Sequence, residues 1–261
     1  MNNVREPAVA GLFYAAAADQ LERDLDALMS HTRATPGPAP KALIVPHAGY
    51  VYSGPVAAAA YRMLVPLRHV IRRVVLFGPA HRVYLDGMAL PDANRFITPL
   101  GTVLVDADLT SELAKLPGVC ISAEAHRQEH SLEVQLPFLQ TVLEQFKLVP
   151  VVVGQCDAQR VADVMDAAWG GPETLIVVSS DLSHYLPYRD AQQIDANTCS
   201  QILDKASTLT GDEACGAYAL NGLMRAQHCE RLTVETVDLR NSGDTAGDKD
   251  RVVGYGAFIL Y

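Results

Sequence analysis

The sequence predicts a single α/β domain spanning 1–261, with a mixed but mostly parallel central sheet flanked by helices. Three unbroken apolar runs support this prediction: ALIV at 42–45, VVLF at 74–77 and LIVV at 175–178. Runs without polar alternation are typical of strands that are covered on both faces. Helix-like stretches alternate with these runs, as they do along α/β folds. A chain of 261 residues is long enough to bury a substantial core.

The other elements are predicted from apolar spacing and from proline and glycine positions. Helices are expected at Ala17–Met29, Val56–Leu64, Asp108–Lys115, Ser131–Phe146, Ala158–Trp169, Tyr188–Ala206 and Asp212–Ala226. Further strands are expected at Gly87–Pro91, Gly101–Val105, Leu148–Val153, Arg231–Leu239 and Arg251–Leu260, the last two as an antiparallel pair or a sheet edge. Ser53 is expected to cap the second helix, and Pro137 to kink or break the fourth. The proline-rich stretch Thr32–Pro40 is expected to be a loop.

Composition excludes several classes of function. The net charge of -9 argues against nucleic-acid binding, which requires a basic surface. No apolar run approaches the length of a membrane span, and the first residues lack the apolar core of a signal peptide. The five cysteines are odd in number and contain no C-x-x-C pair, which argues against a disulfide framework or a zinc ribbon. We therefore expect a cytoplasmic protein with reduced thiols.

Histidines follow the three apolar runs. His47 and His81 come soon after the first and second runs, and His184 follows the third together with Asp181. Open α/β sheets bind ligands at the carboxyl ends of their strands, so we expect these side chains to share one site. Neutral imidazole suits iron, zinc, copper and nickel, and two histidines with one carboxylate form the facial triad of non-haem iron oxygenases. Spacing alone leaves Asp181 and Asp244 open as the carboxylate.

The segment AHRQEHSLE at 125–133 is a further polar cluster. His126 and His130 would share a helix face, but the pattern is not H-E-x-x-H, so a zincin is not indicated. The segment can be read as a helix cap centred on Ser131, as a wall of the active site, or as both.

Hydrolytic chemistry is a weaker alternative. The run SSDLSH at 179–184 contains serine, aspartate and histidine, so that Ser183 and His184 could serve a hydrolase. The chain has no G-x-S-x-G nucleophile elbow, and triads usually draw their members from separate segments. Nucleotide binding has no support, since neither a P-loop nor G-x-G-x-x-G is present.

Several longer motifs resemble the Memo family, named after a mediator of ErbB2-driven cell motility. These motifs are REPAVAGLFY (5–14), VPHAGYVYSG (45–54), GPAH (78–81), EHSLEVQLPFLQ (129–140), SSDLSHY (179–185) and SGDTAGDKDRVVGYGAF (242–258). They cover nearly the whole chain in order. The resemblance implies a fold similar to the LigB-like class III extradiol dioxygenases, which are non-haem iron enzymes, and it implies a metal pocket.

The resemblance also implies roles for individual residues. The two histidine ligands of the family fall on His47 and His81. The third ligand position, a cysteine in animal members, falls within 240–244 and is aligned here with Asp244, which would complete a 2-His-1-carboxylate set. His184 then matches the acid/base histidine of the dioxygenases, and Asp181 becomes an orienting residue or an additional ligand.

The leading functional hypothesis is therefore Fe(II)-dependent dioxygenase or oxidoreductase chemistry on a small organic substrate, with copper or zinc as other possible metals. We expect His130, Tyr50, Tyr52 and Tyr185 to line the pocket, because they are close in sequence to the ligands. The alternative hypothesis is a non-catalytic scaffold that binds a metal or a peptide. Neither hypothesis involves nucleic acid or a membrane.

Overall fold

The computed structural model describes residues 3–31 and 37–261 of the chain. Residues 32–36 of the predicted proline-rich loop lie outside the described residues, and residues 37–40 contain no helix or strand. Within the described residues, no helix is both long and apolar enough to cross a membrane.

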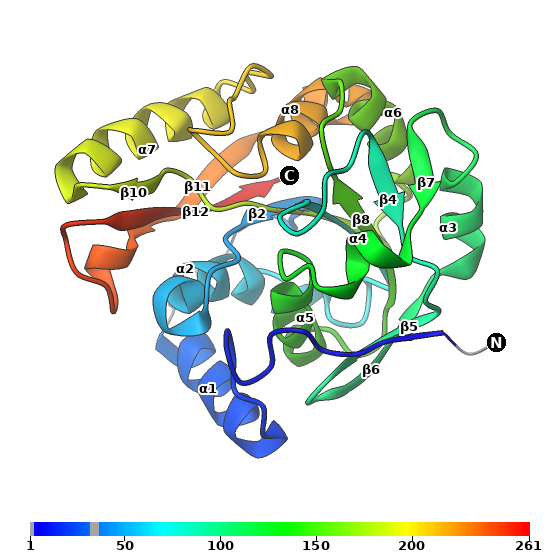
Figure 1. Cartoon of the computed structure of the whole chain (residues 1–261), viewed down its shortest axis with the longest axis horizontal. Helices are drawn as coiled ribbons and strands as arrows, with labels where there is room; N and C mark the ends of the chain where they lie inside the picture. Colours follow the sequence, from blue (N-terminus) through cyan, green and yellow to red (C-terminus); the bar gives the residue numbers. More distant parts are fainter. Residues whose placement is uncertain (1–2, 32–36) are drawn as a thin grey trace.

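A mixed sheet forms the centre of the molecule (Figure 1). Its strands are β1 (Val4–Arg5), β2 (Ala42–Val45), β3 (Arg73–Pro79), β4 (Met88–Leu90), β5 (Arg95–Thr98), β6 (Gly101–Val105), β7 (Val119–Ile121), β8 (Lys147–Val153), β9 (Thr174–Ser179), β10 (His184–Leu186), β11 (Val234–Asn241) and β12 (Val252–Leu260). The main path runs β1-β5-β6-β8-β3-β9-β2-β12-β10, with β11 on β12 and β4 between β8 and β7. Strands β8, β3, β9 and β2 are mutually parallel neighbours, whereas β12 pairs antiparallel with β2, β10 and β11. The predicted mixed α/β sheet is confirmed.

Helices cover both faces of this sheet (Figure 1). The α-helices are α1 (Ala18–His31), α2 (Tyr50–Arg62), α3 (Ala107–Leu113), α4 (Ala123–Arg127), α5 (Leu136–Val142), α6 (Ala158–Ala168), α7 (Tyr188–Leu203) and α8 (Ala217–Arg225). Short 3-10 turns occur at Val65–Leu67, Glu133–Gln135, Gln227–Arg231 and Ser242–Asp244. Helices α1, α2 and α5 lie on one side in the figure, and α3, α6, α7 and α8 on the other.

Alternation along the central strands creates two separate cores. In β3, Val74 and Leu76 pack into the core shared with α1, α2 and α5, while Val75 and Phe77 pack into the core shared with α6 and α8. All four side chains are fully buried. Because successive residues of a strand point to opposite faces, a continuous apolar run is what a sheet covered on both sides requires.

Three helix boundaries differ from the prediction. Helix α2 begins at Tyr50 rather than after Ser53, and Pro55 lies inside it; the Ser53 hydroxyl donates to the Ala48 carbonyl instead of capping. The expected helix at 131–146 is a 3-10 turn followed by α5, with Pro137 in the first turn, where its missing N–H costs no hydrogen bond. The last predicted helix is shorter than expected and begins at Ala217.

The register of the parallel strands sets the position of the site. In β2 and β9, Val45 lies opposite Ser179, and in β3 and β9, Phe77 lies opposite Val178. The carboxyl ends of these three adjacent strands therefore open at the same edge of the sheet. The segments that follow them carry the histidines singled out in the sequence.

Candidate metal centre

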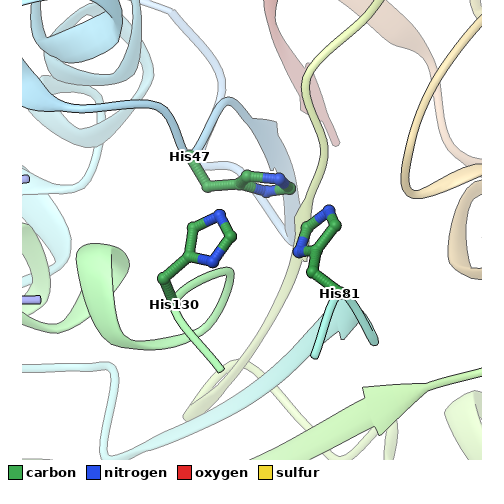
Figure 2. Close-up of side chains that lie close together, drawn as sticks. All are labelled: His47, His81 and His130. Atoms are coloured by element: carbon green, nitrogen blue, oxygen red, sulfur yellow. The ribbon is translucent and has the colours of Figure 1, made fainter. Parts of the chain in front are cut away.

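Three histidines from separate segments meet at this edge of the sheet. His47 follows β2, His81 follows β3, and His130 precedes the 3-10 turn at Glu133–Gln135. One potential ligand nitrogen of each lies within 4.8 Å of those of the other two. The ring centroids are 5.1 Å apart for His47 and His81, 5.5 Å for His47 and His130, and 4.7 Å for His81 and His130. Figure 2 shows the three rings grouped around one space.

Hydrogen bonds fix the tautomer of His47. The Ser179 hydroxyl donates to the Ser131 carbonyl at 2.6 Å, because a carbonyl can only accept. Gln135 Nε2 donates to Ser179 Oγ at 2.8 Å and to the Pro46 carbonyl at 2.9 Å. Since Ser179 has a single hydrogen, His47 Nδ1, at 2.9 Å from Ser179 Oγ, must be the donor in that contact. The lone pair of His47 is therefore on Nε2, where it is available to a metal.

His81 is oriented by a buried carboxylate. Glu129 Oε1 accepts a hydrogen bond from His81 Nδ1 at 3.0 Å, and Glu129 Oε2 accepts the backbone N–H of His81 at 2.6 Å. The same Oε1 accepts the backbone N–H groups of His130 and Ser131, each at 2.9 Å. A carboxylate behind a ligating histidine is the usual way in which proteins orient the ring and direct its other nitrogen toward a metal. Glu129 thus organises two of the three histidine segments.

His130 has a less constrained ring. Its Nδ1 is buried, has no hydrogen-bond partner among the described residues, and lies 3.4 Å from Glu129 Oε1. The Phe13 ring packs against it with a centroid separation of 4.8 Å. A buried imidazole nitrogen without a hydrogen bond is uncommon, and metal coordination is one way in which such a ring is satisfied.

The site favours neutral imidazoles. Burial lowers the pKa of His47 well below its usual value, and the neighbouring His81, His130 and His184 lower it further. Burial also lowers the pKa of His130 to about 4, despite the opposing charge of Glu129. Neutral imidazole is the form that binds metals, so these two rings are ready to ligate at neutral pH.

The two carboxyl groups of the site shift in opposite directions. Burial opposes ionisation of Glu129, but the hydrogen bonds and charge of His81 outweigh it, together with the backbone N–H of Ser131, and lower its pKa to about 2. Burial raises the pKa of Asp181 to about 7, although its Oδ1 accepts the His47 N–H at 2.7 Å. Glu129 is therefore a permanent anion, whereas Asp181 can hold or release a proton near neutrality.

A cavity of about 620 Å³ opens over the histidines. The side chains around it include both polar and aromatic groups. Its lining comprises Phe13, His47, Ala48, Gly49, Tyr52, His81, Arg82, His130, Asp181, His184, Tyr185, Ser242, Gly247, Asp248, Arg251, Val253 and Tyr255. The sequence-predicted residues His184, Asp181, His130, Tyr52 and Tyr185 thus reach the same cavity as His47 and His81. Their individual roles stay predictions.

Two predicted site residues lie elsewhere. Asp244 is exposed, and its carboxylate accepts the Asn241 N–H at 3.0 Å and the Tyr188 hydroxyl at 2.5 Å. It belongs neither to the three-histidine group nor to the cavity lining, because its side chain is used to close the turn at Ser242–Asp244. Tyr50 is buried in the core, where its hydroxyl donates to the Val134 carbonyl at 2.7 Å.

Cys215 is a neighbour of the site that the sequence did not indicate. Its Sγ lies 3.3 Å from His47 Nε2 and accepts the backbone N–H of Asp181 at 3.3 Å. Burial raises the pKa of this thiol, so it is protonated and can donate to His47 Nε2 when that nitrogen holds no metal. Its position just before α8, far along the chain from every histidine of the site, provides no local signal.

The donor set fits a transition metal. Three imidazoles, two of them with their Nδ1 atoms held by hydrogen bonds, leave nitrogen lone pairs next to an open cavity. Imidazole ligands suit zinc, copper, iron and nickel rather than magnesium or calcium. Three histidines beside a cavity leave room for a further group, unlike the closed four-ligand arrangement of structural zinc sites.

Fold and site together define an α/β protein with a candidate three-histidine metal centre at the carboxyl edge of its sheet. A solved structure of an uncharacterized Escherichia coli K12 protein has a similar fold: the match covers 84% of this chain and 98% of that one, with a TM-score of 0.52 and 12% identity. The sequence matches the family described as Memo-like protein over residues 5–259. The chain belongs to this family, and the resemblance expected from its motifs is confirmed.

Two relatives match this chain over nearly their whole length. A MEMO1 family protein of Aquifex aeolicus is 35% identical over 274 residues, a match that covers 98% of this chain and 99% of the relative. A MEMO1 family protein of Methanopyrus kandleri is 34% identical, with 98% of each chain covered. The LigB-like fold assignment stays a prediction.

Proposed function

We propose that this protein is a metal-dependent enzyme that acts on a small organic molecule, and that Fe(II)-dependent oxygenation is the reaction to test first. One observation carries the proposal: three imidazoles converge at an open cavity whose wall also holds a histidine and an aspartate outside the ligand group. A site that only binds a metal would not need further proton-transfer groups in the wall of the cavity beside the metal ligands. His47, His81 and His130 are the proposed ligands, and iron is the proposed metal.

The protein side chains would supply positioning and proton transfer. A bound metal would contribute Lewis acidity and a meeting point for the reactants. His184 lies in the cavity wall, and burial lowers its pKa, so that it is neutral at pH 7 and can accept a proton from a substrate hydroxyl. Asp181, with a pKa of about 7, can exchange a proton in the same space while its other role is to hold the His47 backbone.

A second candidate function follows from the identity of the ligands. Three histidines with an open position are also the ligand set of catalytic zinc sites that activate water. The 2-His-1-carboxylate set expected from the sequence is not the group that the structure assembles, because Asp244 closes a turn outside the cavity. Zinc-dependent hydrolysis is therefore the alternative that the same experiments should test.

The proposed location is the cytoplasm. All five cysteines are free, and three of them are buried in the core that includes α6 and α8. Free thiols are typical of proteins in a reducing compartment such as the cytoplasm.

The decisive experiment measures metal content and oxygen uptake together. Protein purified anaerobically without a metal-affinity tag is analysed for its elements, beside the variants His47→Ala, His130→Ala and Asp244→Ala. We expect about one metal ion per chain in the wild type and in Asp244→Ala, and loss of the metal in both histidine variants. The reverse result for His130→Ala and Asp244→Ala would restore the ligand set predicted from the sequence.

Activity is then followed separately for each metal. Oxygen consumption with a panel of catechols tests the iron-loaded protein, and hydrolysis of activated esters tests the zinc-loaded protein. Oxygen uptake that requires substrate and iron supports the oxygenase. Stoichiometric metal binding with neither activity would favour the non-catalytic metal-binding or peptide-binding scaffold.

A further inference from the structure

The ring of His130 is held differently from the other two rings of the site. Nδ1 of His47 and Nδ1 of His81 each form a hydrogen bond with a side chain. Nδ1 of His130 has no hydrogen-bond partner among the described residues. The orientation of this ring therefore depends on its backbone and on the side chains packed against it. Residues 5–14, here called the N-terminal strap, supply contacts of both kinds.

The strap first fixes the backbone of His130. Arg5 Nη2 donates to the Glu129 carbonyl at 2.5 Å, and Glu129 Oε1 accepts the His130 N–H at 2.9 Å. This carbonyl and this N–H belong to one peptide group, so the group cannot turn without breaking a hydrogen bond on one side. Arg5 Nε also donates to the His126 carbonyl at 3.0 Å. One guanidinium thus holds two points of the chain just before His130.

Arg5 is itself locked in place. Only 5% of its surface is exposed, and its Nη1 pairs with the fully buried carboxylate of Glu133. Glu133 Oε2 accepts the Ala8 N–H at 2.8 Å, and Oε1 accepts the Val9 N–H at 3.0 Å. The Tyr14 hydroxyl donates to Oε1 at 2.5 Å. The guanidinium therefore serves several acceptors through a fixed fork of donors, which the single ammonium of a lysine cannot reproduce.

The far end of the strap packs on the ring of His130. The Phe13 ring lies with its centroid 4.8 Å from that of His130. The Phe13 carbonyl accepts the Tyr50 N–H at 2.8 Å, which ties this end of the strap to the start of α2. The His130 ring also stacks on His81, with centroids 4.7 Å apart and planes 21° from parallel. A movement of the His130 ring toward the space of Phe13 would therefore weaken its contact with His81.

We propose that Arg5 and Phe13 are positioning residues of the candidate metal centre. Arg5 fixes the backbone that carries His130, and Phe13 holds the ring against His81 so that its lone pair stays near those of the other two histidines. This inference rests on the proposed function, because it takes His130 as a metal ligand. It goes beyond that function in assigning the geometry of this ligand to a segment near the N-terminus.

The first measurement is NMR of metal-free protein, which reports the ring positions directly. We expect nuclear Overhauser contacts between the ring protons of His130 and His81, whose centroids are 4.7 Å apart. Arg5→Lys and Phe13→Leu should each weaken these contacts. The contacts between the rings of His47 and His81, with centroids 5.1 Å apart, should persist in both variants. A general loss of structure would weaken both sets of contacts together, so the difference between them separates positioning from stability.

The second measurement is zinc affinity, determined by competition with a chromophoric chelator. Arg5→Lys and Phe13→Leu should each weaken zinc binding about tenfold, because residues that orient a metal ligand typically contribute about 10–100-fold in affinity. Two matched controls alter the same residue types away from the site. Arg73→Lys changes an arginine that pairs with Asp106 at the amino end of β3, and Phe146→Leu changes a half-buried ring after α5. Both controls should bind zinc within about twofold of the wild type.

Unchanged ring contacts of His130 in both variants would refute the inference, and so would zinc affinities within twofold of the wild type in both. If Arg5→Lys does not fold, Phe13→Leu decides, because it shortens only one half-buried side chain. Failure of the proposed function has a different signature: the wild type binds no metal, or His130→Ala retains it. The ring contacts of the metal-free protein then still decide whether the strap positions His130.

Discussion

Replacing Glu129 with glutamine should weaken both the fold and the metal site. The carboxylate accepts four hydrogen bonds, one on Oε2 from the His81 backbone and three on Oε1 from His81 Nδ1 and the backbones of His130 and Ser131. An amide has only one oxygen. In the orientation that keeps more hydrogen bonds, the glutamine oxygen replaces Oε1 and accepts from the three donors. The glutamine NH₂ group then replaces Oε2, which lies 2.6 Å from the His81 backbone nitrogen in the wild type. One buried donor is thus left without an acceptor.

The loss in free energy of unfolding caused by Glu129→Gln can be estimated in two ways. An unsatisfied buried donor costs about 1–3 kcal/mol, and the three remaining hydrogen bonds lose their charge assistance, which gives a total of about 2–4 kcal/mol. The pKa of Glu129 falls from an ordinary 4.5 to about 2 in the folded protein, which corresponds to about 3 kcal/mol of stabilisation of the ionised form. The two estimates agree in order of magnitude.

The pH dependence has a definite sign. Because the folded pKa lies below the unfolded one, this contribution is fully present above pH 4.5 and is lost as the pH falls toward 2. In Glu129→Gln, the free energy of unfolding should therefore fall less steeply over this acid range than in the wild type. Chemical denaturation at a series of pH values measures both the loss at pH 7 and the change of slope.

Metal affinity should fall by about 10–100-fold in the same variant, since His81 loses the carboxylate that orients its ring. Competition with a chromophoric chelator measures this change. Glu124→Gln is the matched control, because Glu124 forms only an exposed pair with Arg127, worth less than about 1 kcal/mol. The reasoning would be falsified if Glu129→Gln bound metal within twofold of the wild type and kept its stability within about 0.5 kcal/mol.

Three further predictions concern the surroundings of the site. Ser179→Ala should weaken metal binding about tenfold in chelator competition and lower the free energy of unfolding by about 1–3 kcal/mol, because the His47 Nδ1–H loses its acceptor. Glu133→Gln should lower the free energy of unfolding by about 3–5 kcal/mol in denaturant titrations, since it breaks the buried pair with Arg5. The His130 ring protons of metal-free protein should titrate by NMR near pH 4 instead of 6.5, and this protonation should remove stability as the pH falls from 6.5 toward 4.

Two control variants distinguish the effects of Ser179→Ala and Glu133→Gln from the effect of any substitution of similar size at the surface. Ser111→Ala removes an exposed hydroxyl that bonds only the Ala107 carbonyl, and Asp19→Asn removes an exposed partner of Arg23. Both should change stability by less than about 1 kcal/mol. A loss in either control as large as that in Ser179→Ala or Glu133→Gln would contradict the assigned roles, as would a His130 midpoint near 6.5.

Much of the fold could be predicted because local patterns agree with tertiary structure. The three apolar runs became β2, β3 and β9, adjacent and parallel, and the alternating C-terminal stretches became the antiparallel pair β11 and β12. Helix boundaries were less accurate where a side chain had two possible partners. Ser53 has the chemistry of a cap, but its hydroxyl reaches the Ala48 carbonyl from within α2, and no local pattern distinguishes these outcomes.

The site was predictable only where its residues follow strands. His47 and His81 were identified because a strand end places them, and the fold brings them together as expected. His130 was expected only to line the pocket. Its position beside His81 depends on Glu129, whose carboxylate binds both the His130 backbone and His81, 48 positions earlier in the sequence. Asp244 was favoured by alignment with the family, whereas the carboxylate is used within its own turn.

The contacts of the segment Glu129–Gln135 have a consequence for when the site can form. Glu133 binds Arg5 near the N-terminus, Gln135 and Ser131 bind Ser179 at the end of β9, and His47 receives its backbone anchor from Asp181, 134 positions later. A growing chain therefore contains all three histidines, and the Glu129 that orients His81, well before it contains the groups that orient His47. Until synthesis has passed β9, His47 has neither its fixed tautomer nor its anchor. A metal that uses His47 as a ligand would accordingly meet a fully arranged site only after β9 has been synthesised.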